Sequence, residues 1–123
     1  EFIKGGYVVS DGDDFTLVAS GSELEIAFKI KAALLEYSVR IISVPILNKL
    51  SNMQNEEINK LLKNKHVFPI ELGRSIGWES YLGRITKTFS IDSFGKSAPI
   101  EDLEKNFGFD VPSITKEIIK YLN

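Results

Sequence analysis

The amino-acid sequence predicts an α/β domain, built as a three-layer α/β/α sandwich around a mainly parallel sheet. Short β-type runs alternate with helical patterns along the chain, which is typical of crossover connections onto a parallel sheet. The run at residues 15–19 is apolar almost throughout, as in strands that are covered on both faces. The length of 123 residues, with 43% hydrophobic and 26% charged residues, fits one globular domain with one core.

The β-type runs are bounded by turn residues. They are predicted at residues 7–9, 15–19, 40–44, 66–72 and 85–91. A polar cluster with a central glycine at residues 10–14 separates the first two, and Pro45 ends the third. Pro69 stands inside the fourth run. Because proline is normally excluded from central strands, this strand should lie at a sheet edge or carry a bulge at Pro69.

A first helix is predicted to begin after the run at 15–19. Ser22 and Glu25 have the spacing of a capping box, which marks a helix N-terminus. Helical spacing predicts that the residues facing the core are Leu24, Phe28, Ala32 and Leu35.

Three further helices are predicted downstream. A second capping box, Ser51 with Gln54, precedes a helix that contains Ile58, Leu61 and Leu62. A short helix begins at residues 97–99, with proline in its first position, and ends at Gly108. The last helix begins at Pro112 and runs to the end of the sequence. Its apolar residues stand four apart, at Ile114, Ile118 and Leu122.

The composition excludes several kinds of site. The chain has no cysteine, which excludes disulfides, thiolate catalysis and Cys-ligated metal sites. A single histidine excludes a multi-histidine metal site, and the net charge of −2 provides no basic field for nucleic acid or anionic membranes. The apolar runs are shorter than a membrane span, and residues 1–15 are too acidic for a signal peptide. We therefore expect a soluble cytoplasmic domain.

One candidate site lies where two strands are predicted to end. Ser20, Gly21 and Ser22 join a strand to a helix N-terminus, where free N–H groups could hold an anion, although capping alone explains both serines. Glu71 ends its strand directly before Gly73. Its carboxylate could be a general base, or it could accept N–H bonds from the glycine-rich turn, and we favour the structural role. Together Ser20, Ser22, Glu71 and Gly73 form a candidate anion or regulatory site.

Other chemistry-bearing residues have simpler explanations. His66 is the only obvious general base, but it stands at the amino end of a strand, whereas sites in open α/β sheets gather at the carboxyl ends. Trp78 and Tyr81, three residues apart among glycines, could form a stacking platform, although a packed aromatic anchor is commoner. Lys96 could bind a phosphate before the helix at 97–99, but one lysine is weak evidence. No set of residues makes a complete active site, which favours a module that completes a larger protein.

Several segments resemble the C-terminal domain of transketolase. These are LVASGSE at residues 17–23, VRIISVP at 39–45 and the stretch from Glu71 to Gly83, similar to the family's E-x-G…GW-x-x-Y-x-G. The most specific match is FGKSAP at residues 94–99, followed by Leu103 and FGF at 107–109, which resembles a string of the bacterial, yeast and plant type. The resemblance covers essentially the whole chain, in order.

The resemblance implies a five-stranded, mostly parallel sheet whose first strand is antiparallel. It also places the strand that contains Pro69 inside the sheet, where the family usually has an aliphatic residue. Full-length transketolase is a homodimeric transferase of the pentose phosphate pathway. It moves a two-carbon ketol unit between sugar phosphates with thiamine diphosphate and a divalent metal, Mg or Ca.

In the family, two upstream domains hold the cofactor and the substrate. The resemblance therefore implies that residues 1–123 form one C-terminal domain, a fragment of a longer chain, with no catalytic, cofactor-binding or metal-binding residue. Its partners would be the upstream domains of the same polypeptide, and its role structural or regulatory. The isolated domain is expected to be inactive.

Two alternatives stay open. The chain could be the matching domain of another thiamine-diphosphate enzyme, such as a dihydroxyacetone synthase or a pyruvate dehydrogenase β-type subunit, although FGKSAP argues against the dehydrogenase. It could also be a stand-alone α/β module that binds a small anion or a protein through Ser20, Ser22, Glu71 and Gly73.

Overall fold

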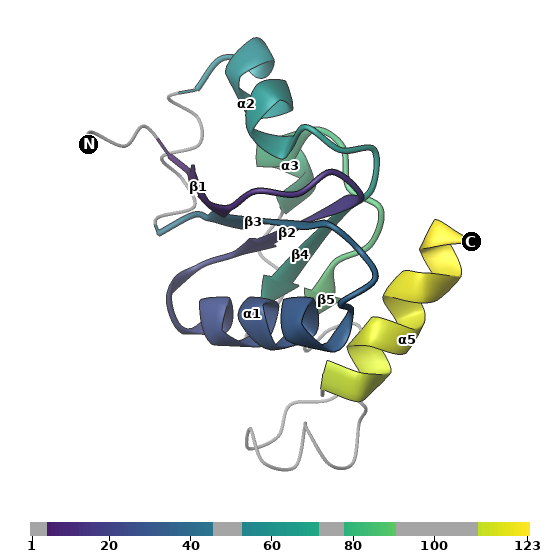
Figure 1. Cartoon of the computed structure of the whole chain (residues 1–123). Coiled ribbons are helices and arrows are strands. Elements are labelled where there is room, and N and C mark those ends of the chain that lie inside the picture. Colours follow the sequence, from purple (N-terminus) through teal and green to yellow (C-terminus); the bar gives the residue numbers. More distant parts are fainter. Residues whose placement is uncertain (1–4, 46–52, 72–77, 91–110) are drawn as a thin grey trace.

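A computed structural model describes residues 5–45, 53–71, 78–90 and 111–123. In these residues a sheet of five strands lies between two helical layers (Figure 1). The strands are β1 (Tyr7–Ser10), β2 (Phe15–Ala19), β3 (Val39–Ser43), β4 (Val67–Glu71) and β5 (Phe89–Ser90). The helices are the 3₁₀ turn η1 (Gly21–Glu23), α1 (Leu24–Ala33), α2 (Asn55–Leu62), α3 (Trp78–Leu82) and α5 (Val111–Leu122). The α/β class is confirmed.

The sheet is mixed, with the strand order β1-β3-β2-β4-β5. β1 pairs antiparallel with β3, and all other neighbours are parallel, which confirms the antiparallel first strand. The register of β1 shifts between Val8, opposite Ile42, and Ser10, opposite Ile41, so this edge strand contains an irregularity of the β-bulge type.

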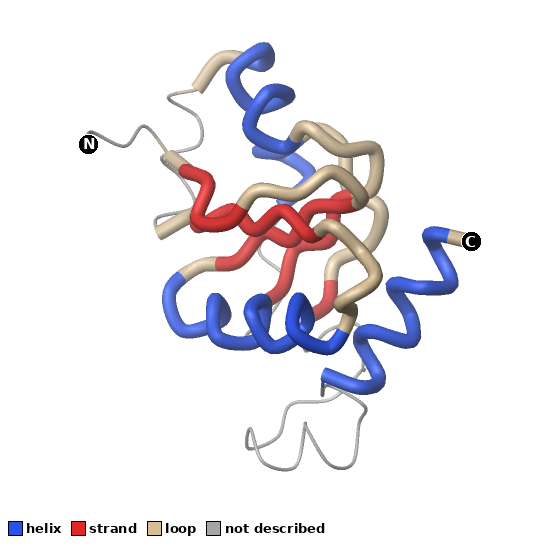
Figure 2. The backbone as a smooth tube through the Cα atoms, in the orientation of Figure 1, coloured by secondary structure: helices blue, strands red, loops and turns tan. Residues whose placement is uncertain are grey.

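The side chains of the sheet pack into two separate cores, one on each face, because successive side chains of a strand point to opposite faces. α1 and α5 cover one face, and α2 and α3 cover the other (Figure 2). In β2, Phe15 and Leu17 pack toward α1, while Val18 packs toward α2. Trp78 anchors α3 in the second core and is fully buried, so the expectation of a packed aromatic anchor at this position is correct.

Of the four residues predicted to face the core from α1, only Leu24 packs against it. Ala27, Ile30 and Leu34 are buried against the sheet, whereas Phe28 is 44% exposed and Leu35 is 85% exposed. Ala32 is also exposed. Apolar residues occur on opposite sides of this helix, so helical spacing alone is compatible with more than one inward face.

The predicted capping box at the start of α1 was also wrong. The 3₁₀ turn at Gly21–Glu23 comes first, so the N-cap residue is Glu23, and it makes no side-chain capping bond. Ser22 therefore lies within a turn of helix instead of in front of it.

The capping box of α2 lies three residues later than predicted. Gln54 is the N-cap residue, and its N–H donates a hydrogen bond to Glu57 Oε1 at 2.9 Å. Gln54 was expected at the N3 position of the capping box. It is instead the N-cap residue, because Glu57 stands three residues further on and takes the N3 position. Ser51 lies outside the described residues.

Pro69 lies in an interior strand, between β2 and β5, as the resemblance implies, so of the two alternatives, an edge strand or a bulge, the edge strand is excluded. Val67 exchanges hydrogen bonds with Thr86 on the β5 side: its N–H donates to Thr86 Oγ1 at 3.0 Å, and its carbonyl accepts from the Thr86 N–H at 2.8 Å. Because alternate residues of a parallel strand bond to the same neighbour, Pro69 also faces β5. The β4–β5 ladder begins only at Ile70, opposite Phe89, so the missing N–H falls before the ladder starts.

The remaining predicted elements are partly described. Among residues 85–90, only Phe89–Ser90 form a strand, shorter than the predicted run. α5 begins at Val111, one residue before the predicted start at Pro112, and buries Ile114 and Ile118 as the spacing predicts. The short helix predicted from residues 97–99 to Gly108 lies outside the described residues.

Candidate functional site

Two residues of the predicted anion site come together at the carboxyl edge of the sheet. β2 and β4 are adjacent and parallel, with Ala19 opposite Ile70. One residue further along each chain, Ser20 therefore lies beside Glu71. Both residues are half-buried. The side chain of Ser22 and all of Gly73 lie outside the described residues, so the four-residue site stays a prediction.

The main chain around Ser20 is organised by hydrogen bonds. The Ser20 carbonyl accepts from the Glu23 N–H at 3.0 Å, which closes the 3₁₀ turn, and the Ala19 carbonyl accepts from the Val44 N–H at 2.8 Å. Gly21 takes a φ of +51°, which side chains other than glycine rarely adopt. The turn therefore fixes the main chain of Ser20 at the end of β2.

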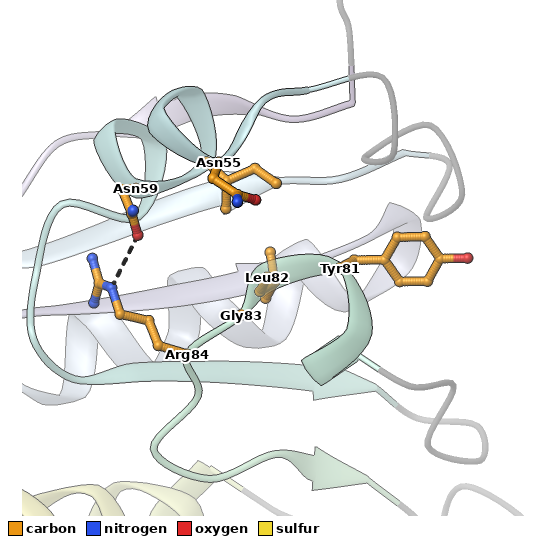
Figure 3. A pocket seen from close by; sticks show the side chains of 7 residues that line it. Asn55, Asn59, Tyr81, Leu82, Gly83 and Arg84 are labelled. Atoms are coloured by element: carbon orange, nitrogen blue, oxygen red, sulfur yellow. Dashed lines mark hydrogen bonds between the residues drawn. The ribbon is translucent and has the colours of Figure 1, made fainter.

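A pocket of about 310 Å³ lies between α2 and the residues at the end of α3 (Figure 3). It is lined by Asn55, Ile58, Asn59, Tyr81, Leu82, Gly83 and Arg84. The Arg84 Nε donates to Asn59 Oδ1 at 3.5 Å, and Arg84 Nη1 donates to the carbonyl of Asn64 just after α2. The Tyr81 ring points away from this pair. Arg84 thus serves to fasten the end of α2 to the segment after α3.

Sequence reasoning missed this pocket. Its two walls are separated by about twenty residues, and neither Asn59 nor Arg84 belongs to a motif. The only local signal was Gly83, which takes a φ of +84° directly after α3 and turns the chain back toward α2.

A network of polar side chains ties together the amino ends of β2, β3 and β4. Thr16 is fully buried, and its hydroxyl donates to the Leu62 carbonyl at 2.6 Å. The amide of Asn64 donates to Thr16 Oγ1 and to the Gly12 carbonyl, each at 3.1 Å. Gly12 itself lies so close to β3 that a Cβ atom there would approach the Val39 carbonyl carbon to 2.3 Å.

Charged groups surround this network. Asp11 bonds to Arg40 Nη1 at 2.5 Å, and Lys63 Nζ lies 2.5 Å from Asp13 and 3.6 Å from Asp11. The hydrogen bond from the Gly12 N–H and that from Arg40 lower the pKa of Asp11 below its ordinary value of 3.8. The hydrogen bond to Asp13 raises the pKa of Lys63 above 10.5. These charges stabilise the turn between β1 and β2.

Lys63 occupies a strained backbone conformation at the end of α2. Its φ is 63° and its ψ is −60°, and the Leu62 carbonyl accepts a 2.6 Å hydrogen bond from the Asn64 N–H two residues on. This is a γ-turn of the rare form with positive φ. The turn directs the Asn64 side chain into the network.

The structure also places the other candidate residues. His66 stacks on Phe68, with ring centroids 6.4 Å apart, and its Nδ1 lies 3.5 Å from Thr86 Oγ1, so it has structural contacts at the amino end of β4. Lys96 lies outside the described residues. In the described part of the chain, no group of three or more His, Cys, Asp or Glu side chains comes together. None of the described helices is long and apolar enough to cross a membrane.

Fold and site together define an α/β sandwich domain with a mixed sheet and a polar carboxyl edge. Comparison with known proteins adds the family. The family model described as "Transketolase-like TK C-terminal domain" matches residues 5–110, and the chain belongs to this family.

Individual relatives agree. The chain is 34% identical over 128 residues to the transketolase of Bacillus subtilis, covering 98% of this chain and 19% of the relative. It is 35% identical over 126 residues to the dihydroxyacetone synthase of Candida boidinii, covering 97% and 17%. A solved structure of transketolase from Leishmania mexicana superposes with a TM-score of 0.78 at 30% identity, covering 97% of this chain and 18% of that one. The chain thus spans less than a fifth of the length of these relatives.

Proposed function

We propose that this chain is the C-terminal domain of a transketolase, whose whole polypeptide transfers a two-carbon ketol unit between sugar phosphates. One observation carries the proposal: 98% of the chain aligns with a transketolase at 34% identity, yet it spans only 19% of that protein. The family description assigns the matched 5–110 segment to the C-terminal domain.

Within that enzyme we assign the chain a structural or regulatory role. Thiamine diphosphate and a divalent metal would be held by the rest of the polypeptide, and the sugar phosphates would bind there as well. The network at the amino ends supports this assignment, because its charged and polar groups are bonded to one another. The carboxyl edge around Ser20, Ser22, Glu71 and Gly73 is the place we propose for a regulatory anion, supported by the pairing of Ala19 with Ile70 at the ends of adjacent parallel strands.

The proposal extends to the assembly and setting of the enzyme. We expect a homodimer that works in the cytoplasm, in the pentose phosphate pathway. Two relatives, from Solanum tuberosum and Zea mays, are named as chloroplastic transketolases, so the compartment is to be tested by locating the enzyme in its own cell.

The test compares the full reading frame with the isolated chain. The full-length protein, with thiamine diphosphate and Mg²⁺, should convert a ketose phosphate and an aldose phosphate into the exchanged pair of sugars. The isolated chain should show no transfer and no heat of binding in calorimetric titration with thiamine diphosphate and Mg²⁺. Micromolar binding by the isolated chain, or an inactive full-length protein, would overturn the proposal.

The second candidate is a dihydroxyacetone synthase, favoured by the 35% identity to the enzyme of Candida boidinii. The same full-length protein distinguishes the two activities. When formaldehyde is offered beside the aldose phosphate as a second acceptor of the two-carbon unit, dihydroxyacetone as the main product would support the second candidate, whereas sugar phosphates as both products would support the first.

A further inference from the structure

We propose that the Asp11–Gly12 peptide, in the turn between β1 and β2, is a site of covalent self-modification at which aspartate is converted to isoaspartate, and that the folded turn slows this conversion. The product is formed by the chain itself, through a cyclic succinimide. Because the reaction involves neither sugar phosphate nor cofactor, the inference goes beyond the proposed function and does not depend on it.

The reaction needs only the chain and water. The main-chain nitrogen of Gly12 attacks Cγ of the protonated Asp11 side chain, an N–Cγ bond forms, and the carboxyl hydroxyl leaves as water with the amide proton. A second water then opens the imide ring. Cleavage of the N–Cγ bond restores aspartate, whereas cleavage at the former peptide carbonyl leaves isoaspartate. In the latter product the main chain runs through Cβ and Cγ.

Sequence and geometry single out Asp11 for this reaction. It is the only aspartate or asparagine in the sequence that is followed by glycine, which has no Cβ to hinder the attack of its nitrogen. The Gly12 N–H donates to Oδ1 of Asp11 at 2.8 Å, so the attacking nitrogen already lies beside the carboxyl group. The Asp11 side chain is 69% exposed, which gives water access to the ring. The reacting groups are therefore close together in the folded chain.

Charge works against the attack, because a carboxylate is far less electrophilic than a neutral carboxyl group. Arg40 Nη1 lies 2.5 Å and Lys63 Nζ 3.6 Å from the same Oδ1 of Asp11. The hydrogen bond from the Gly12 N–H and these two cations lower the pKa of Asp11 and keep its side chain ionised. Asp13 is bonded to the same lysine and shares its charge. Loss of Lys63 should therefore leave more of the Asp11 side chain protonated at a given pH.

The main chain of Gly12 is also held in place. Attack requires the nitrogen to face Cγ, whereas in the structure its N–H points at Oδ1, so the peptide has to rotate first. The Gly12 carbonyl accepts from the Asn64 amide at 3.1 Å, and a Cβ atom on Gly12 would come within 2.3 Å of the Val39 carbonyl carbon. Isoaspartate adds one carbon to the main chain directly before this close contact. The folded turn therefore resists both the rotation and the product.

The test measures isoaspartate in the full-length protein by peptide mapping and by methylation with an isoaspartyl-specific carboxyl methyltransferase. In guanidinium chloride, conversion at Asp11 should be at least about tenfold faster than in the folded protein, because the turn is no longer held. It should also be faster there than at Asp13 or Asp14, which glycine does not follow.

Lys63→Gln tests the ion pair in the folded protein. At about pH 6 it should speed conversion about twofold to fivefold, the range set by one exposed ion pair. The rise in rate with falling pH should also begin at a higher pH, a signature that a loosened fold alone does not give. The matched control Lys65→Gln removes the same charge from an exposed lysine that is not bonded to Asp11, and it should leave rate and pH profile unchanged.

Three results would overturn the inference. Conversion at Asp11 no faster than at Asp13 in the unfolded protein would remove the site. Equal rates in the folded and unfolded protein would show that the turn does not slow the reaction. An unchanged pH profile in Lys63→Gln would remove the role of the ion pair. Ketol transfer enters none of these readouts, so the failure of this inference and that of the proposed function are distinguishable.

Discussion

At the amino ends of the parallel strands, side chains bond to main-chain atoms far away in the sequence. Thr16 reaches Leu62, 46 residues on, and Asn64 reaches back 52 residues to Gly12. At the carboxyl ends, Ser20 and Glu71 lie side by side, and the bonds identified around Ser20 are those of its own turn and of the sheet. The amino ends are cross-linked over distance, whereas the carboxyl end at Ser20 is shaped locally.

This difference suggests a division of roles, in which the amino ends of the strands stabilise the fold and the carboxyl ends are left for binding. Ligands of open α/β sheets bind outside the carboxyl ends of the strands, so polar groups there also have to serve a ligand. Polar groups at the amino ends are under no such demand and are available for hydrogen bonds that fix the register of the sheet. Substitutions at the amino ends should therefore cost more stability than substitutions at Ser20.

The largest effect is expected for Gly12→Ala. The added Cβ would lie 2.3 Å from the Val39 carbonyl carbon and 2.6 Å from the Arg40 nitrogen, both main-chain atoms that side-chain rotation cannot move. We expect a loss of about 3 kcal/mol in the free energy of unfolding, measured by urea denaturation. Gly21→Ala is the control. It has open space around it but a positive φ, so it should cost about 1 kcal/mol. A smaller loss for Gly12→Ala than for Gly21→Ala would contradict the close approach.

Asn64→Ala should come next. The buried amide satisfies both Thr16 Oγ1 and the Gly12 carbonyl, and its removal leaves these groups without that donor. A loss of about 2 kcal/mol is expected. Ser20→Ala, at the carboxyl end, should change the stability by less than about 0.5 kcal/mol. Equal losses of stability for the two variants would contradict the conclusion that the amino ends contribute more to stability than the carboxyl end at Ser20.

Lys63 offers a change in the opposite direction. Glycine adopts a φ of +63° without strain, so Lys63→Gly should be more stable than Lys63→Ala by about 1 kcal/mol. Both variants lose the ion pairs with Asp11 and Asp13, and their difference therefore isolates the backbone conformation. Thermal unfolding of the two variants measures it. Identical midpoints would show that the turn at Lys63 relaxes freely.

The smallest effect is expected from acid. The pKa of Asp11 is lower in the folded chain than its ordinary value of 3.8, so its contribution to stability is complete above that pH and is lost as the pH falls through the folded pKa. Asp11 is 69% exposed, and solvent screens its partners. In urea denaturation between pH 5 and about 2, Asp11→Asn should lose less stability than the unaltered chain. Parallel curves would show that Asp11 adds nothing.

The alternation of elements was enough to predict the fold class, since strand and helix patterns switch period clearly at Ser20 and again before Val39. The antiparallel first strand was expected from the family resemblance, and the structure confirms it. Pro69 predicted either an edge strand or a bulge, because a single sequence does not show which neighbouring strand a residue bonds to. In the structure the main chain at Pro69 faces β5, before that ladder begins.

Side-chain direction was harder to predict than element type. In α1 the choice between two apolar sides depended on where the sheet and α5 lie, which no local spacing encodes. The candidate anion site stays a prediction: the pairing of β2 with β4 puts Ser20 and Glu71 at the carboxyl ends of adjacent parallel strands. The pocket at Asn59 and Arg84 went unpredicted because it depends on two distant segments meeting.

Trp78 makes it possible to follow the unfolding of one of the two cores separately. It is the only tryptophan in the sequence, and it is fully buried in the core beneath α2 and α3. Its fluorescence therefore reports on the loosening of that layer, while circular dichroism weighs all helices together. Coincident melting by the two signals would show that both layers unfold as one cooperative unit.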